Sequence, residues 1–132
     1  MNEKRLLRLA KRLESLKANR GRRFDLKYWY RANCETTACA IGEAGLLKEF
    51  NKEGFTLTAD LPPFYGFGVD GGHTVLIPAF EGKTNNDAVK AFFGISDRDV
   101  NYLFLYYSYD YKATAKDVAK RIRMFVAERR PS

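Results

Sequence analysis

The residues of this chain that could do covalent chemistry are two cysteines and one histidine: Cys34, Cys39 and His73. A cysteine near the N-terminus of a helix has its thiolate form favoured by the helix dipole. A histidine that the fold brings beside such a thiol can act as its general base. These three residues are therefore the candidate catalytic group. The hypothesis depends on His73, because the sequence has no second histidine.

A helix-borne cysteine followed by a strand-borne histidine is similar to the chain order of papain-like hydrolases and amidases. Two features weigh against this hypothesis. His73 adjoins Gly71 and Gly72, where a solvated histidine in a turn needs no further explanation. The helices expected after residue 84 also displace the strands that a papain-like core requires. A papain-like Cys/His hydrolase or amidase is thus the alternative hypothesis, and a non-enzymatic role is favoured.

The two cysteines also have structural interpretations. Within one helix, the axial rise over five residues separates Cys34 from Cys39 by about 7.5 Å, which exceeds the Cα span of roughly 4.4–6.8 Å in disulfides. They can pair only if Cys34 precedes a helix capped by Thr36 or Thr37. Buried structural thiols, a local disulfide or redox pair and a reactive thiol all remain open. Two cysteines and one histidine give only three zinc ligands, so we expect no metal.

One glycine motif is rejected on its context. Residues 66–71 spell G-x-G-x-x-G, the pattern of dinucleotide-binding loops. Such a loop must open a helix within a βαβ unit to hold a pyrophosphate. Here the motif precedes an expected strand, so we expect neither a nucleotide site nor a cofactor.

The charge of the chain is segregated. The formal net charge is +7, with 11 Lys and Arg against 3 acids in residues 1–31, 5 against 11 in residues 32–111, and 7 against 2 in residues 112–132. Terminal helices that lie side by side would form one basic face able to meet nucleic acid or an acidic protein. The alternative is a solvated surface that offsets the acidic middle. The candidate contact residues are Arg8, Arg12, Arg121, Arg123 and two members of a tyrosine-rich strip, Tyr106 and Tyr107.

Apolar spacing and punctuation residues predict the elements. Leucines at positions 6, 9, 13 and 16 predict an amphipathic helix over residues 3–18, and alternation predicts an extended segment over 24–28. Residues 55–58, 64–69 and 73–77 are expected to form a small antiparallel meander with a turn at Asp70-Gly71 and an end at Pro78. Later helices are expected to begin at Thr84 and at two capping boxes, Ser96/Asp99 and Thr114/Asp117.

The stretch between residues 36 and 53 predicts the central helix. Ala38 to Leu47 consists of small and apolar residues apart from Glu43, and Gly42 and Gly45 each cost about 1 kcal/mol of helix propensity relative to alanine. Helices carry such glycines where another backbone approaches closely. The expected structural core is Phe24, Trp29, Cys39, Gly42 and Leu46.

These elements predict one α+β domain over residues 1–132, with four or five helices around a central small-residue helix and a small antiparallel sheet. No run approaches the roughly 18 apolar residues of a membrane span. The basic N-terminal stretch has no secretory apolar region. We therefore expect a cytoplasmic protein without membrane contact, with free cysteines as the default.

The assembled motifs resemble a family of small uncharacterised bacterial and phage proteins. The shared pattern is FD…W…C-x-T-x-A-C-x-x-G, here from Phe24 to Gly42, followed by FFG-[IL]-S…LF, here from Phe92 to Phe104. Glu35 stands where the family has glycine, and Glu43 where it often has histidine. The resemblance covers about residues 22–127 and implies an architecture but no activity. The basic termini and the tyrosine-rich strip favour an accessory or binding protein, of phage or prophage type as the resemblance implies, with a protein partner or nucleic acid as its ligand.

Overall fold

The computed structural model describes twelve elements within residues 1–16, 22–24, 30–32, 36–38, 40–59, 74–105, 108–109 and 113–129. The helices are α1 (Glu3–Glu14), α2 (Ala40–Leu46), α3 (Lys48–Lys52), α4 (Asn85–Phe93), α5 (Asp97–Phe104) and α6 (Ala115–Arg129). The strands are β1 (Arg22–Phe24), β2 (Tyr30–Ala32), β3 (Thr36–Ala38), β4 (Thr56–Ala59), β5 (Thr74–Phe80) and β6 (Lys83–Thr84).

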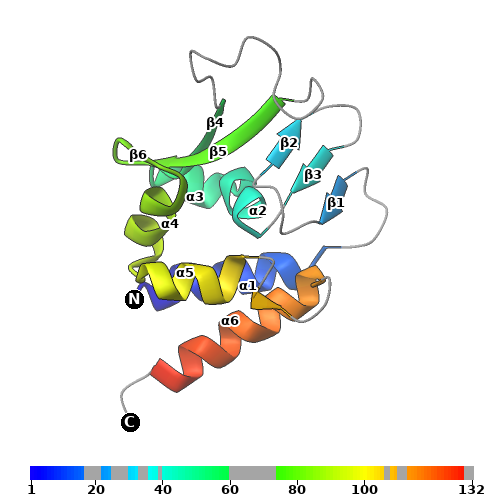
Figure 1. The fold of residues 1–132 in the computed structure, drawn as a ribbon, viewed down its shortest axis with the longest axis vertical. Coiled ribbons are helices and arrows are strands. Elements are labelled where there is room, and N and C mark those ends of the chain that lie inside the picture. Colours follow the sequence, from blue (N-terminus) through cyan, green and yellow to red (C-terminus); the bar gives the residue numbers. More distant parts are fainter. Residues whose placement is uncertain are drawn as a thin grey trace.

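The strands form a single sheet that lies on one side of the molecule. Its order is β1-β3-β2-β5-β4, with β6 paired to β5 (Figure 1). Only β1 and β3 run parallel, while β3 with β2, β2 with β5 and β5 with β4 pair antiparallel. Pro78 pairs with Leu57 of β4 and falls between the residues of β5 that pair with β2 and those that pair with β6. The strand therefore continues through the proline to Phe80.

The helices are arranged so that α2 lies between the sheet and α1. Helix α2 contacts β2, β3, β4 and β5 on one side and α1 on another. Helices α1, α5 and α6 form a layer farther from the sheet, in which α1 and α6 run in opposite directions (Figure 1). This arrangement buries Ala40 to Gly45 of α2, including Glu43.

The core is dominated by phenylalanines from the sheet and the middle helices. Phe92 of α4 packs against Phe50, Phe55 and Phe80, with ring centroids 4.9, 4.4 and 5.1 Å away. Leucines 6, 9 and 13 of α1 are fully buried, and α6 contributes Ile122 and Phe125. Burial of this many large apolar side chains is the main force that holds the helical layer against the sheet.

The α+β class, the central small-residue helix and the antiparallel sheet are confirmed. Gly42 is buried, as expected, and Leu46 is partly buried. Gly45 is also tightly placed, but the neighbour is the side chain of Leu57 and not another backbone. Only the backbone of Phe24 is described, in β1, and Trp29 and Cys39 lie outside the described residues.

Several element boundaries differ from the expectations. Helix α1 ends at Glu14, because the hydroxyl and amide of Ser15 donate to carbonyls of the last turn, among them that of Arg12. Thr36 and Thr37 belong to β3 and do not cap a helix, consistent with the preference of β-branched residues for strands. Leu47 has an extended backbone that separates α2 from α3, so six helices occur among the described residues.

Of the expected helix caps, the two capping boxes are confirmed, whereas Thr84 precedes α4 without a side-chain capping bond. Ser96 and Asp99 form a reciprocal capping box at α5, and Thr114 and Asp117 exchange the same pair of bonds at α6. Gly94 closes α4 in a left-handed conformation at φ 64°. The expected strand 64–69 and the Asp70-Gly71 turn lie outside the described residues.

Candidate binding surface

The residues of the hydrolase hypothesis lie outside the part of the chain that the structure describes: this holds for Cys34, Cys39 and His73 alike. The helix N-terminus that the hypothesis uses is found at Ala40 and not near Thr36. Among the described residues, no group of three or more His, Cys, Asp or Glu side chains is placed to hold a metal ion. Within the same residues, no helix combines the length and apolar character needed to cross a membrane.

The basic face of α1 is held against α2 and α3 by three ion pairs. Arg5 pairs with Glu53 at 3.1 Å, Arg8 with Glu49 at 2.7 Å, and Arg12 with Glu43 at 3.3 Å. The arginines are three and four residues apart, so they follow one side of the helix. Their partners occur in the reverse order along the chain, because α1 runs antiparallel to the α2–α3 segment.

The innermost of these pairs is the most enclosed. The side chain of Glu43 is 3% exposed and that of Arg12 is 28% exposed. A buried carboxylate needs a charged or hydrogen-bonding partner, so Arg12 compensates the charge of Glu43 inside the α1–α2 interface. Arg5 is anchored further by a hydrogen bond of 2.8 Å to the Phe92 carbonyl oxygen and by its position over the Phe92 ring.

The two arginines proposed on α6 are also used inside the molecule. Arg123 donates to both carboxylate oxygens of Glu14, at 2.6 and 2.7 Å, and so links α6 to α1. These hydrogen bonds lower the pKa of Glu14 and raise the pKa of Arg123.

Arg121 is engaged without an acid from the described part of the chain. One of its guanidinium nitrogens donates to the carbonyl oxygens of Tyr102 and Ser108. The guanidinium carbon lies 3.6 Å from the ring centroid of Tyr109 and 4.5 Å from that of Tyr102. This arginine therefore ties α6 to the segment that follows α5. Tyr106 and Tyr107, the other candidates of this region, lie outside the described residues.

A groove of about 700 Å³ runs over the outward face of α1, with α3 and α6 beside it. Its lining contains six basic and two acidic side chains. The lining residues are Asn2, Lys4, Arg5, Leu7, Arg8, Lys11, Glu49, Phe50, Lys52, Glu53 and Arg123. Arg8 and Arg123 both belong to this lining, so the structure brings these two candidates to one surface. Arg12 and Arg121 do not line it.

The free positive charge of this groove belongs to lysines. Lys4 and Lys11 of α1 and Lys52 of α3 are exposed, and the described residues provide no ion pair for any of them. Arg8 lowers the pKa of Glu49 through their hydrogen bond, and the positive charges of Lys11 and Lys4 lower it further. The positive charges of Lys4 and Lys11 would also attract an acidic ligand in the groove.

The sequence did not single out these lysines as a binding site, although it contains the relevant signal. Lys4, Leu7 and Lys11 have the spacing of one helix face, with a partly buried leucine between two lysines. The missing information was which charges of α1 would be neutralised by the acidic segment 43–53.

Comparisons of the chain with protein-family models, with curated proteins and with solved structures find no match. The family resemblance drawn from the motifs therefore stays a prediction.

Proposed function

We propose that this protein is a non-enzymatic binding protein that receives an acidic segment of a protein partner in the α1 groove. One observation carries the proposal: Lys4, Lys11 and Lys52 surround the groove and form no salt bridge with any described residue. Each of the arginines that line the groove is paired with a glutamate. The groove is therefore built on internal ion pairs and keeps separate lysines for a ligand.

Its composition favours a protein over nucleic acid. Proteins that bind nucleic acid gain most of their affinity from lysine and arginine contacts to phosphates. Here the arginines proposed for that role donate to glutamates or to carbonyl oxygens. Leu7 also lies between the two lysines of α1, and an apolar contact at that position has a counterpart on a protein surface but none on a phosphate backbone.

The test compares two polyanions and two charge-reversal variants. Fluorescently labelled poly-L-glutamate and a labelled 20-base-pair DNA duplex are titrated with the full chain, and binding is followed by fluorescence anisotropy at low and moderate salt. We expect poly-L-glutamate to bind and its affinity to fall with salt, because exposed charges are screened. Lys4→Glu/Lys11→Glu should weaken this binding at least tenfold, a factor that corresponds to about 1.4 kcal/mol.

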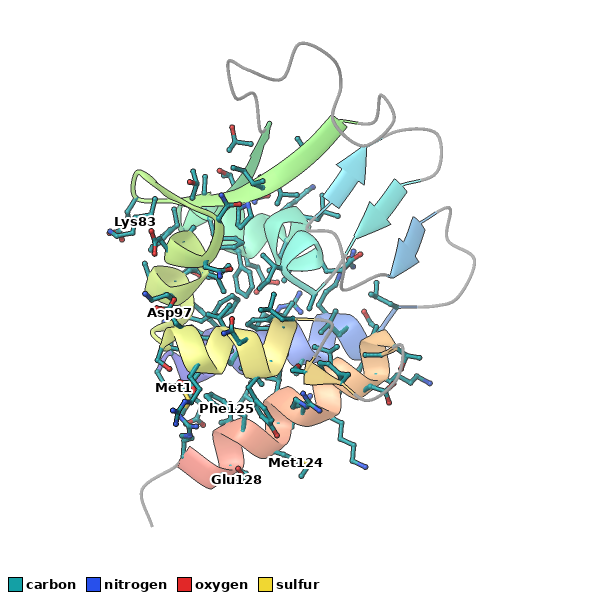
Figure 2. The ribbon with its side chains drawn as sticks, in the orientation of Figure 1. Met1, Lys83, Asp97, Met124, Phe125 and Glu128 are labelled. Atoms are coloured by element: carbon teal, nitrogen blue, oxygen red, sulfur yellow. The ribbon has the colours of Figure 1, made fainter. Side chains whose placement is uncertain are left out.

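The matched control is Lys83→Glu/Lys116→Glu. It changes the net charge by the same amount at two exposed lysines outside the groove, and Figure 2 shows Lys83 beside the turn that precedes α4. We expect this variant to bind nearly as the unmodified protein does. An equal loss of affinity in both variants would mean that net charge alone determines binding, and would contradict the groove as the binding site. Tight DNA binding that requires Lys4 and Lys11 would replace the protein partner by nucleic acid.

A further inference from the structure

We propose that the occupant of the α1 groove is a helix that presents an acidic, an apolar and a second acidic residue at spacings i, i+3 or i+4, and i+7. This inference rests on the proposed function and specifies the partner of the same site. It is carried by the order of Lys4, Leu7 and Lys11 in the groove lining.

The spacing of the two lysines sets the geometry of the ligand. Lys4 and Lys11 are seven residues apart on α1, which corresponds to an axial distance of about 10.5 Å and to nearly two full turns. Both side chains therefore lie on one face, and Leu7 lies between them on the same side of the helix. A ligand that neutralises both lysines must place two carboxylates about this far apart with an apolar group between them.

A helical ligand meets this requirement and an extended one does not. In a helix, acids at i and i+7 repeat the lysine spacing, and the residue at i+3 or i+4 reaches Leu7. In a strand, the same distance corresponds to about three residues, and residues three apart point to opposite faces. An extended acidic segment that lies along α1 could therefore place a carboxylate next to only one of the two lysines.

The sides of the groove are compatible with an acidic helix. Glu49 and Glu53 of α3 are the two acids of the lining, and each is tied to an arginine of α1. Because their charges are compensated, they leave the field of the groove positive. Lys52 lies on the same helix and offers a contact for an additional acid of the ligand. Helix α1 is 12 residues long, so it can support about 18 Å, or three turns, of a partner helix.

The experiment uses two labelled synthetic peptides of identical length and composition in an alanine- and glutamine-rich helical background. The matched peptide carries two glutamates at the i and i+7 spacing with a leucine at i+3, while the shifted peptide moves the second glutamate by two positions, away from that face. We expect the matched peptide to bind the full chain about fivefold more tightly at low salt, since one exposed ion pair contributes up to roughly 1 kcal/mol. Circular dichroism must show equal helicity of both peptides.

Two variants assign the preference to the groove. Lys11→Gln should abolish the difference between the two peptides, whereas Leu7→Gln should weaken both and keep a preference for the matched one. Thermal unfolding of each variant shows that the fold is retained.

The outcomes separate the two proposals. If both peptides bind equally and both lose affinity in Lys4→Glu/Lys11→Glu, the helical spacing is wrong and the acidic protein partner stands. If neither peptide nor poly-L-glutamate binds, the proposed function falls with it. A fivefold preference that persists in Lys11→Gln would place the ligand elsewhere and overturn this inference.

Discussion

Gly45 offers the sharpest test of how the central helix is packed against the sheet. A Cβ built on Gly45 would overlap the side chain of Leu57 in β4, lying 2.6 Å from its Cδ2 atom. Replacing glycine by alanine within a helix ordinarily stabilises it by about 1 kcal/mol. Forcing a methyl group into a packed interface costs roughly 1–3 kcal/mol. We therefore expect Gly45→Ala to leave stability unchanged or to lower it by up to about 2 kcal/mol.

The decisive measurement is the same substitution in a Leu57→Ala background. Removing the Leu57 side chain removes the overlap, so Gly45→Ala should now stabilise the protein by about 1 kcal/mol. Urea unfolding of the parent, the two single variants and the double variant gives the coupling free energy, in which the intrinsic cost of Leu57→Ala cancels. A stabilising Gly45→Ala in the parent, or an equal effect in both backgrounds, would refute the close packing of α2 on β4.

Two further predictions concern the helix termini. Ser96→Ala should lower the free energy of unfolding by about 1 kcal/mol, because the Ser96 hydroxyl accepts a hydrogen bond from the Asp99 amide. Thr84→Ala should change the free energy of unfolding little, since the Thr84 side chain makes no capping bond. Equal urea midpoints for the two variants would contradict this prediction. Hydrogen bonds from Thr114 lower the pKa of Asp117 from its ordinary value of 3.8, so the charged form stabilises the fold above that pH and this stabilisation is lost as the pH falls through the lower folded pKa. Asp117→Asn should therefore be destabilising at neutral pH and nearly neutral in its effect at a pH below the folded pKa, as measured by urea unfolding under both conditions.

The parts of the fold that follow from local sequence are those with strong periodicity or end signals. The leucine spacing of α1 and the two capping boxes each involve residues within a few turns of one another, so the sequence contains all partners. The sheet is different. Strands β1, β2 and β3 have three residues each and owe their existence to pairing with distant segments. Short strands of this kind carry too little periodicity to be distinguished from a helix cap. For this reason Thr36 and Thr37 were expected to cap a helix although they belong to β3.

The end of β5 illustrates the same limit. Pro78 is a reasonable strand terminator in isolation, because it cannot donate a backbone hydrogen bond. The strand tolerates Pro78 because this residue lies between the residues of β5 that pair with β2 and those that pair with β6. This pairing pattern is a property of the assembled sheet and is not encoded near the proline.

The candidate site required the same kind of non-local information. The segregation of charge placed an excess of basic residues in the two terminal segments, which form α1 and α6. A basic helix has two possible uses: to meet an external anion or to pair with the acidic middle of its own chain. The structure separates these uses by residue type. Arginines form hydrogen bonds with carboxylates through a planar fork, as Arg123 does with Glu14, and so suit fixed internal pairs.

Lysine carries a compact and strongly hydrated charge on a flexible stem, which suits an exposed surface that exchanges ligands. On α1 the division follows this chemistry, since Arg5, Arg8 and Arg12 form salt bridges with glutamates while Lys4 and Lys11 form none with a described residue. The acidic segment between residues 43 and 53 thus forms salt bridges with the arginines of the N-terminal helix and sets the orientation of this helix. The positive charge that remains for a partner is smaller than the net charge of the sequence suggests. Its position is fixed by Lys4 and Lys11, which these salt bridges do not include.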